Sequence, residues 1–114
     1  MRILIAEDDT ALQEIAGRLM TRRGFTPDIV SNGQEAVDRA RANEGKYDLC
    51  LMDIDMPVMN GLEAARIIRR TVKYFPIMAL TGSVRDEEEY LTSGMDDFLE
   101  KPYSIKTLRV KLIP

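Results

Sequence analysis

The sequence has 114 residues, which is the size of a single domain and leaves no room for a second one. Its 16 basic and 19 acidic residues give a formal net charge of −3, which argues against a nucleic-acid or anionic-membrane surface because both need a basic excess. The absence of histidine and of long apolar runs excludes histidine-based metal sites, Ser-His triads, a transmembrane helix and a signal peptide.

Apolar runs of strand length alternate with segments of helical periodicity along the whole sequence. The predicted strands are the short apolar runs at residues 2–6, 48–52, 76–80 and 98–99, with a weaker strand at residues 26–30. The predicted helices follow these strands: they begin at Thr10 and at Ser31 and cover residues 61–73, 85–93 and 104–113. Such alternation predicts right-handed crossovers and a parallel sheet that helices cover on both faces.

The ends and faces of two helices carry further signals. Asp9 is expected to cap the first helix rather than bind metal, although Thr10 and Gln13 also have the spacing of a capping box. Gly24 is expected to end this helix. Its predicted buried face is the recurring apolar set Ala11, Leu12, Ile15, Ala16, Leu19 and Met20. The third helix carries a basic stripe, which we interpret as complementing its C-terminus: Arg66, Arg69, Arg70 and Lys73.

The fold class follows from this pattern of elements. We expect one α/β domain over residues 1–114, with a doubly wound, flavodoxin-like (βα)5 fold and strand order 2-1-3-4-5. In this order, ligands bind beyond the carboxyl ends of the first and third strands. The functional residues should therefore follow those two strands.

Candidate site residues follow four of the five predicted strands, while the second strand, an edge strand in this order, is followed only by Ser31 and Asn32. The polar residues that follow the four strands are Glu7, Asp8 and Asp9 after the first, Asp53 and Asp55 after the third, Thr81 after the fourth and Lys101 after the fifth. Carboxylates about 4 Å apart repel by roughly 4 kcal/mol per pair at an effective dielectric near 20, so some are protonated or a cation lies among them. Oxygen ligands without histidine or cysteine favour Mg²⁺. An aspartate beside a metal ion, a lysine and a threonine is typical of a phosphoryl acceptor.

Four motifs occur in order along the chain, each near the end of its expected strand: ILIAEDD, DLCLMDIDMPVMNGLEAARIIR, ALTG and GMDDFLEKP. With these motifs the chain resembles a two-component response-regulator receiver domain over nearly its whole length. The resemblance implies that Asp53 accepts a phosphoryl group from a phosphohistidine on a sensor histidine kinase or a histidine phosphotransfer protein. MPVMNG and GMDDFLEKP are most similar to receivers of hybrid sensor kinases and phosphorelays. Such a domain catalyses only its own phosphorylation and dephosphorylation.

The resemblance also implies a set of residues around Asp53. Asp8 is expected to bind Mg²⁺ directly, and Glu7 to act through water. Asp55 is expected to supply its backbone carbonyl to the metal while its side chain points to solvent. Lys101, whose bond to the following proline is cis in the family, is expected to hold the phosphoryl oxygens.

A conformational switch is implied as well. Thr81 is expected to sense the phosphoryl group, and Gly82 to keep the following loop open. Phe98 matches the aromatic switch residue, where many relatives have tyrosine, so its inward state would depend on packing alone. The affected surface, formed by the segments 85–93, 98–99 and 104–113, is expected to carry Tyr90 and Glu87 and to support a weak homodimer.

The residues at the sheet edge also allow two other functions. Asp53 and Asp55 also form the D-x-D of a haloacid-dehalogenase-type phosphohydrolase, but Asp96 and Asp97, as the second acidic pair, precede the last strand and lie at the wrong edge. A receiver that acts as an interaction module without phosphorylation stays open as a further alternative. The single cysteine, Cys50, cannot form an internal disulfide, which fits a cytoplasmic location.

Overall fold

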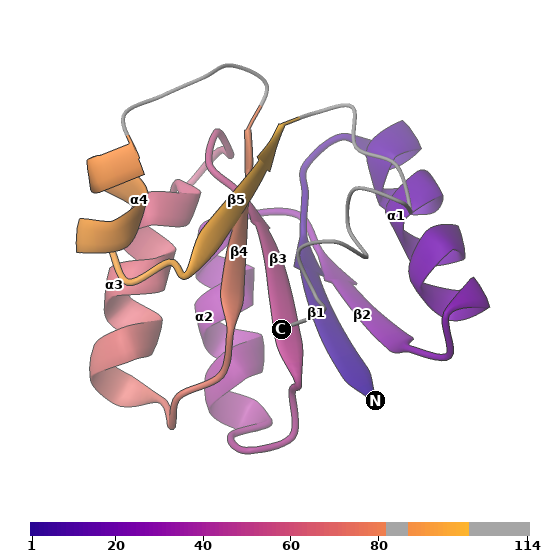
Figure 1. Ribbon diagram of the computed structural model, residues 1–114, viewed down its shortest axis with the longest axis horizontal. Helices are drawn as coiled ribbons and strands as arrows, with labels where there is room; N and C mark the ends of the chain where they lie inside the picture. Colours follow the sequence, from indigo (N-terminus) through magenta and orange to yellow (C-terminus); the bar gives the residue numbers. More distant parts are fainter. Residues whose placement is uncertain (82–86, 101–114) are drawn as a thin grey trace.

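Five parallel strands form one sheet in the order β2-β1-β3-β4-β5 in the computed structural model of the protein, which describes residues 1–81 and 87–100 (Figure 1). The strands are β1 (Arg2–Ala6), β2 (Thr26–Val30), β3 (Leu49–Asp53), β4 (Ile77–Thr81) and β5 (Asp97–Glu100). The helices are α1 (Thr10–Arg22), α2 (Gly33–Ala42), α3 (Gly61–Thr71) and α4 (Glu87–Thr92). The predicted fold class and strand order are confirmed. The predictions for Gly82, Lys101 and its proline, and the helix at 104–113, lie outside the described residues.

Both β3 and β4 lie one residue further along the chain than predicted. The parallel register explains the shift, because Cys50 pairs with Ile77 and Asp53 pairs with Leu80. Backbone pairing therefore extends the third strand beyond its apolar run. As a result, Asp53 is the last residue of β3 rather than the first residue after it.

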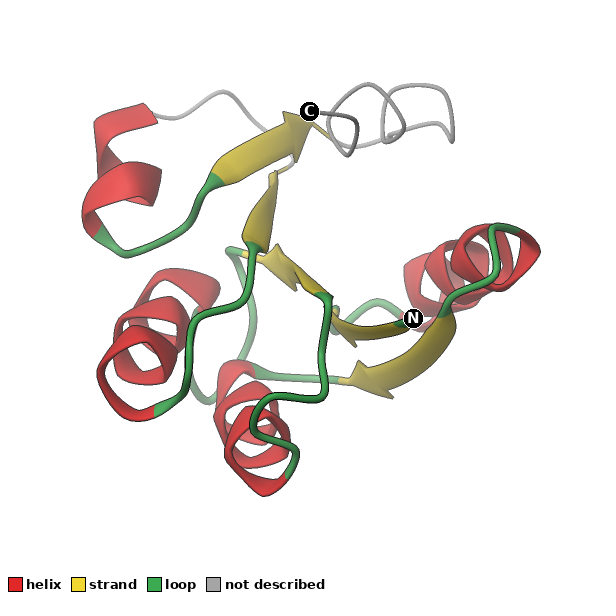
Figure 2. Ribbon diagram, turned by 60° about the horizontal axis from the view of Figure 1, so that its bottom comes forward, coloured by secondary structure: helices red, strands yellow, loops and turns green. Residues whose placement is uncertain are grey.

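The helices that the structure describes lie on both faces of the sheet. Figure 2 shows α1 on one side of the sheet and α2, α3 and α4 on the other. Alternating strand residues divide in the same way: Leu4 and Cys50 pack with α2 and α3, while Ile5 and Leu51 pack with Met20 of α1. The near-continuous burial of β1, β3 and β4 is what a sheet covered on both faces requires.

The start of α1 settles which residue caps it. The Asp9 carboxylate accepts hydrogen bonds from the backbone N–H groups of Ala11 at 2.8 Å and Leu12 at 3.1 Å. Asp9 is therefore the N-cap, as predicted. The prediction of a capping box formed by Thr10 and Gln13 is wrong. The predicted buried face is also too wide, because Ile15 is 53% exposed.

β2 differs from the other strands because it is an edge strand, and most of it is only partly covered. The backbone of Thr26 and Val30 faces β1: the N–H of Thr26 donates to Met1, and the carbonyl of Val30 accepts from Glu7. Since the backbone of successive strand residues alternates in direction, Pro27 and Ile29 face outward. β2 has the predicted bounds, and its partial burial follows from its place at the edge of the sheet.

No helix in the described part of the chain combines the length and the apolar character needed to cross a bilayer.

Candidate functional site

The carboxyl ends of β1 and β3 lie side by side, at the upper edge of the sheet in Figure 1. Ala6, the last residue of β1, pairs with Met52, so the next residue along each chain segment, Glu7 and Asp53, meet at the same level. This is the point in the strand order where the crossovers change direction, and where doubly wound sheets bind ligands.

Three carboxylates come together at this edge. Glu7, Asp8 and Asp53 each offer an oxygen, and these oxygens all lie within 4.8 Å of one another. Glu7 is 2% exposed and Asp53 is 5% exposed, whereas Asp8 is exposed to solvent. Two of the three charged groups are therefore held away from bulk water. Because burial weakens screening, their mutual repulsion is larger than it would be at an open surface.

Backbone N–H groups orient two of these carboxylates. The N–H of Asp9 donates to Glu7 Oε2 at 3.2 Å, and the N–H of Asp55 donates to Asp53 Oδ1 at 3.3 Å. Asp55 itself is exposed, in agreement with its side chain pointing to solvent. The donor set is made of oxygen atoms alone, which fits a hard divalent cation such as Mg²⁺ and does not fit the softer metals that prefer nitrogen or sulfur.

A glycine allows the loop after β3 to return to the site. A Cβ built on Gly61 would lie 2.1 Å from the backbone oxygen of Asp53, so a larger residue there would displace the main chain of Asp53. The N–H of Gly61 donates to the carbonyl of Ile54 at 2.8 Å and closes the loop. The Asn60 side chain then accepts from the N–H of Glu63 at 2.9 Å and caps α3. This close approach fixes the backbone around Asp53.

Gln13 also belongs to the site, although no motif in the sequence points to it. Its side-chain amide donates to the carbonyl of Glu7 at 2.6 Å and to the Ser31 hydroxyl at 3.1 Å, so it connects α1 to the ends of β1 and β2. The contact with Ser31 joins residues that are 18 positions apart, and no local pattern in the sequence predicts it.

The hydroxyl and aromatic residues assigned to the switch lie on the two strands beyond β3. Thr81 ends β4, is fully buried and pairs with Glu100 of β5. Phe98 is half-buried, and its ring centroid lies 5.4 Å from that of Tyr90 on α4. Tyr90 is 1% exposed, so its predicted position on the surface is wrong. The fold buries it because α4 turns this residue toward the apolar core of the sheet.

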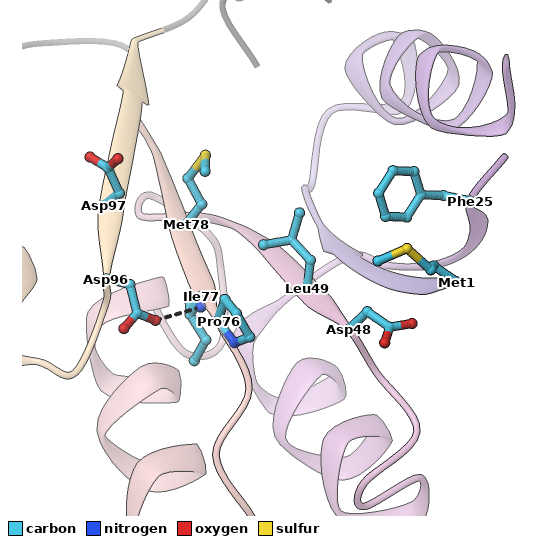
Figure 3. Close-up of a pocket in the computed structure, with 9 residues that line it drawn as sticks. All are labelled: Met1, Phe25, Asp48, Leu49, Pro76, Ile77, Met78, Asp96 and Asp97. Carbon is cyan, nitrogen blue, oxygen red and sulfur yellow. Dashed lines mark hydrogen bonds between the residues drawn. The ribbon is translucent and has the colours of Figure 1, made fainter. Parts of the chain in front are cut away.

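Asp96 and Asp97 lie at the opposite edge of the sheet. They line a cavity of about 520 Å³ there, together with Leu49 and Ile77 (Figure 3). The Asp96 carboxylate accepts from the N–H of Ile77, the first residue of β4, at 2.8 Å. These two aspartates therefore cannot join Asp53 in a common site, which argues against a haloacid-dehalogenase-type phosphohydrolase.

Comparison with known families decides the assignment. Residues 3–113 match the response regulator receiver domain family. The chain belongs to this family. A receiver function in phosphorelay signalling fits this membership and the carboxylates at the edge of the sheet.

Receiver sequences from eukaryotes are among the similar proteins. The chain is 39% identical to hybrid signal transduction histidine kinase I of Dictyostelium discoideum, and the match covers 94% of this chain and 7% of the kinase. It is 39% identical to two-component response regulator 24 of Arabidopsis thaliana, and the match covers 92% of this chain and 76% of that protein. The chain thus spans most of one relative and a small fraction of the other.

Solved receiver structures have the same fold. One is the receiver domain of a Pseudomonas aeruginosa sensor histidine kinase, with a magnesium ion coordinated in its active site cleft. Its TM-score is 0.87 at 32% identity, over 97% of this chain and 93% of that chain. Another is the receiver domain of a Saccharomyces cerevisiae response regulator in complex with a histidine phosphotransfer protein. Its TM-score is 0.88 at 32% identity, over 98% of this chain and 86% of that chain.

Proposed function

We propose that Asp53 of this receiver accepts a phosphoryl group from a phosphohistidine on another protein or domain. The observation that carries the proposal is the grouping of the Glu7, Asp8 and Asp53 oxygens within 4.8 Å at the edge between β1 and β3. Because these 114 residues contain no histidine, the phosphohistidine lies outside them. A sensor histidine kinase or a histidine phosphotransfer protein supplies it, which is supported by the phosphotransfer complex of the yeast relative.

The chemistry is a displacement at phosphorus. An Asp53 carboxylate oxygen forms the new bond to phosphorus while the bond from phosphorus to the imidazole nitrogen breaks. The imidazole leaves with the electron pair of that bond and takes up a proton from water. The N–H of Asp55, which donates to Asp53 Oδ1 at 3.3 Å, holds the carboxylate in place before attack. Hydrolysis of the acyl phosphate by water then restores Asp53.

Magnesium is the cofactor of this proposal. Asp8 and Asp53 hold it directly, Glu7 holds it through water, and Asp55 contributes its backbone carbonyl. When bound, Mg²⁺ supplies positive charge that balances the carboxylates and the incoming phosphoryl oxygens. Burial of Glu7 and Asp53 excludes water from one side of the cluster, which strengthens their hold on a cation. The magnesium ion in the Pseudomonas relative supports this assignment.

Phosphorylation of Asp53 is proposed to act through Thr81, Lys101 and Phe98. The Thr81 hydroxyl donates to a phosphoryl oxygen, and Lys101 pairs with another. Phe98 then turns toward the space that Thr81 leaves, which shifts a population of the receiver to a second conformation. We further propose that residues 1–114 act as one domain in the cytoplasm and form a weak homodimer through the surface that includes α4 and β5.

Intact mass after incubation with a small acyl phosphate and Mg²⁺ tests the proposal. The wild-type chain should gain the mass of one phosphoryl group, and Asp53→Asn should gain none. Asp55→Asn is the matched control, because only its backbone is assigned to the site, and it should be phosphorylated as the wild type is. Equal phosphorylation of Asp53→Asn and wild type would show that Asp53 is not the acceptor. A wild-type chain that gains no mass would favour the interaction module.

A further inference from the structure

Tyr90 has a hydroxyl group that finds no hydrogen-bond partner among the residues that the structure describes. The side chain lies in the core between the sheet, α3 and α4 and is 1% exposed. Its Oη is fully buried and makes no hydrogen bond with any residue that the structure describes. A buried hydroxyl without a partner destabilises the conformation that contains it, because the group has lost its hydrogen bonds to water.

Other buried hydroxyl groups in the described chain are paired. Tyr47, which is 6% exposed, donates from its hydroxyl to Asp28 at 2.6 Å. Ser93, one turn after Tyr90, donates to the backbone carbonyl of Tyr90 at 2.7 Å. The unpaired hydroxyl is therefore a property of this one position and not of buried tyrosines or of α4 in general.

Tyr90 contacts the residue assigned to the switch. Its ring lies 5.4 Å from the ring of Phe98, measured between centroids, at an interplanar angle of 33°. Phe98 pairs with Ala79 on β4, and Thr81 lies two residues further along that strand. Residues two apart on a strand face the same side, so Phe98, Thr81 and Tyr90 all lie on the side of the sheet that α3 and α4 cover.

The C-terminal end of α4 is held firmly in place. Arg69 on α3 donates from Nε to the carbonyl of Gly94 at 2.6 Å and from Nη1 to the carbonyl of Phe75 at 2.7 Å. The N–H of Met95 donates to the carbonyl of Tyr90 at 3.0 Å. With this end fixed, rearrangement of the aromatic pair involves the rings themselves rather than a displacement of the turn after α4.

We infer that Tyr90 is a positioning residue of the switch, whose unpaired hydroxyl raises the free energy of the arrangement in which its ring packs against that of Phe98. The inference rests on the proposed function, since it needs a second conformation that phosphorylation of Asp53 favours. In that conformation Phe98 has turned toward Thr81 and no longer covers Tyr90, so the Tyr90 hydroxyl reaches water. Phe98 has no hydroxyl group of its own. The Tyr90 hydroxyl on α4 influences the switch instead, because it destabilises the resting conformation.

Thermal unfolding of Tyr90→Phe tests the first half of the inference. Removal of an unpaired buried hydroxyl should raise the melting temperature of the protein without any phosphoryl mimic. Tyr47→Phe makes the same chemical change at a paired hydroxyl and should lower the melting temperature. If Tyr90→Phe lowers it as Tyr47→Phe does, the Tyr90 hydroxyl has a partner and the inference is wrong.

Titration with beryllofluoride and Mg²⁺, followed by the amide chemical shifts of residues 87–100, tests the second half. Because Tyr90→Phe stabilises the resting state alone, the concentration at the midpoint should rise about three- to tenfold relative to wild type. Tyr47→Phe should leave the midpoint unchanged. An unchanged midpoint in Tyr90→Phe, with wild type responding normally, would overturn this inference and leave the proposed function intact. A wild-type chain that forms no beryllofluoride complex would overturn the proposed function, and the inference with it.

Discussion

The two ends of the sheet hold acidic side chains in different surroundings. At the amino end, Asp28 pairs with Arg2 at 2.5 Å and Asp96 pairs with Arg69 at 2.7 Å. At the carboxyl end, carboxylates lie next to other carboxylates, with Glu7, Asp8 and Asp53 within 4.8 Å. Grouped carboxylates at the carboxyl end favour the binding of a cation. Ion pairs at the other end contribute stability.

The amino end also uses aromatic rings to support its ion pairs. The guanidinium of Arg69 lies 4.7 Å from the ring centroid of Tyr74, and that of Arg2 lies 5.0 Å from the ring centroid of Tyr47. The hydroxyl of Tyr74 donates to Asp96 at 2.8 Å. Each arginine is therefore held by a carboxylate and a ring together, which is more than an exposed ion pair provides.

Of the changes proposed here, removal of Arg69 at the amino end of the sheet should lower the free energy of unfolding most. Arg69→Ala deletes the ion pair with Asp96 and the hydrogen bonds to the carbonyls of Gly94 and Phe75. We expect the free energy of unfolding to fall by about 3 kcal/mol, measured by urea denaturation. Arg66→Ala, an exposed change on the same helix, should shift it by less than about 0.5 kcal/mol. Equal effects of the two changes would show that these contacts do not stabilise the fold.

Neutralising one carboxylate at the carboxyl end of the sheet should raise the free energy of unfolding, whereas removing Arg69 lowers it. Asp8→Asn relieves repulsion and should raise the free energy of unfolding without metal by about 1 kcal/mol, while it weakens Mg²⁺ binding at least about tenfold. Both are measured by urea denaturation, with a chelator and across a Mg²⁺ titration.

Asp9→Asn provides the control for that experiment. Asparagine caps a helix as well as aspartate does, and Asp9 is assigned to the cap of α1 rather than to the metal. Its Mg²⁺ affinity should stay near that of wild type. A loss of metal affinity in Asp9→Asn as large as in Asp8→Asn would place the metal differently from our proposal.

A fall in pH should remove the stabilising contribution of Asp28 at the amino end, with a smaller effect on the free energy of unfolding than the changes above. The hydrogen bond from Tyr47, followed by the hydrogen bond and charge of Arg2, lowers the pKa of Asp28 below its usual value. A carboxyl with a lowered folded pKa stabilises the fold above its unfolded pKa of about 4, and this contribution is lost as the pH falls below that value. Between about pH 5 and about pH 3, the urea midpoint of wild type should fall more steeply than that of Asp28→Asn. Asp38→Asn, an exposed change, should follow wild type.

The comparison of the two ends also shows what the sequence can predict. Five strands that alternate with helices predict the strand order, because right-handed crossovers between parallel strands leave few arrangements. Acids placed directly after β1 and β3 then lie near each other, since the carboxyl ends of parallel strands share one edge. The convergence of Glu7 and Asp53 follows from topology alone.

Contacts between distant side chains could not be predicted in this way. The sequence predicts Arg69 in a basic stripe, but Arg69 contacts Gly94, which is 25 residues away, and Asp96. The charged segment 85–93 predicts Tyr90 on the surface, but the structure buries this side chain in the core. Helical periodicity predicts Ile15 in the core, but Ile15 is exposed. Packing decides these positions, and a local pattern contains no information about the partner.

The edge strand β2 has a consequence for how copies of this chain meet. Of its five residues, Pro27 and Ile29 turn their backbones outward, and proline has no N–H group to donate. Within the strand, only Ile29 offers an outward N–H to an incoming chain. A continuous ladder of hydrogen bonds cannot form there, so this edge is a poor template for strand addition and for fibril growth. Concentrated receiver should therefore resist aggregation by backbone pairing through β2.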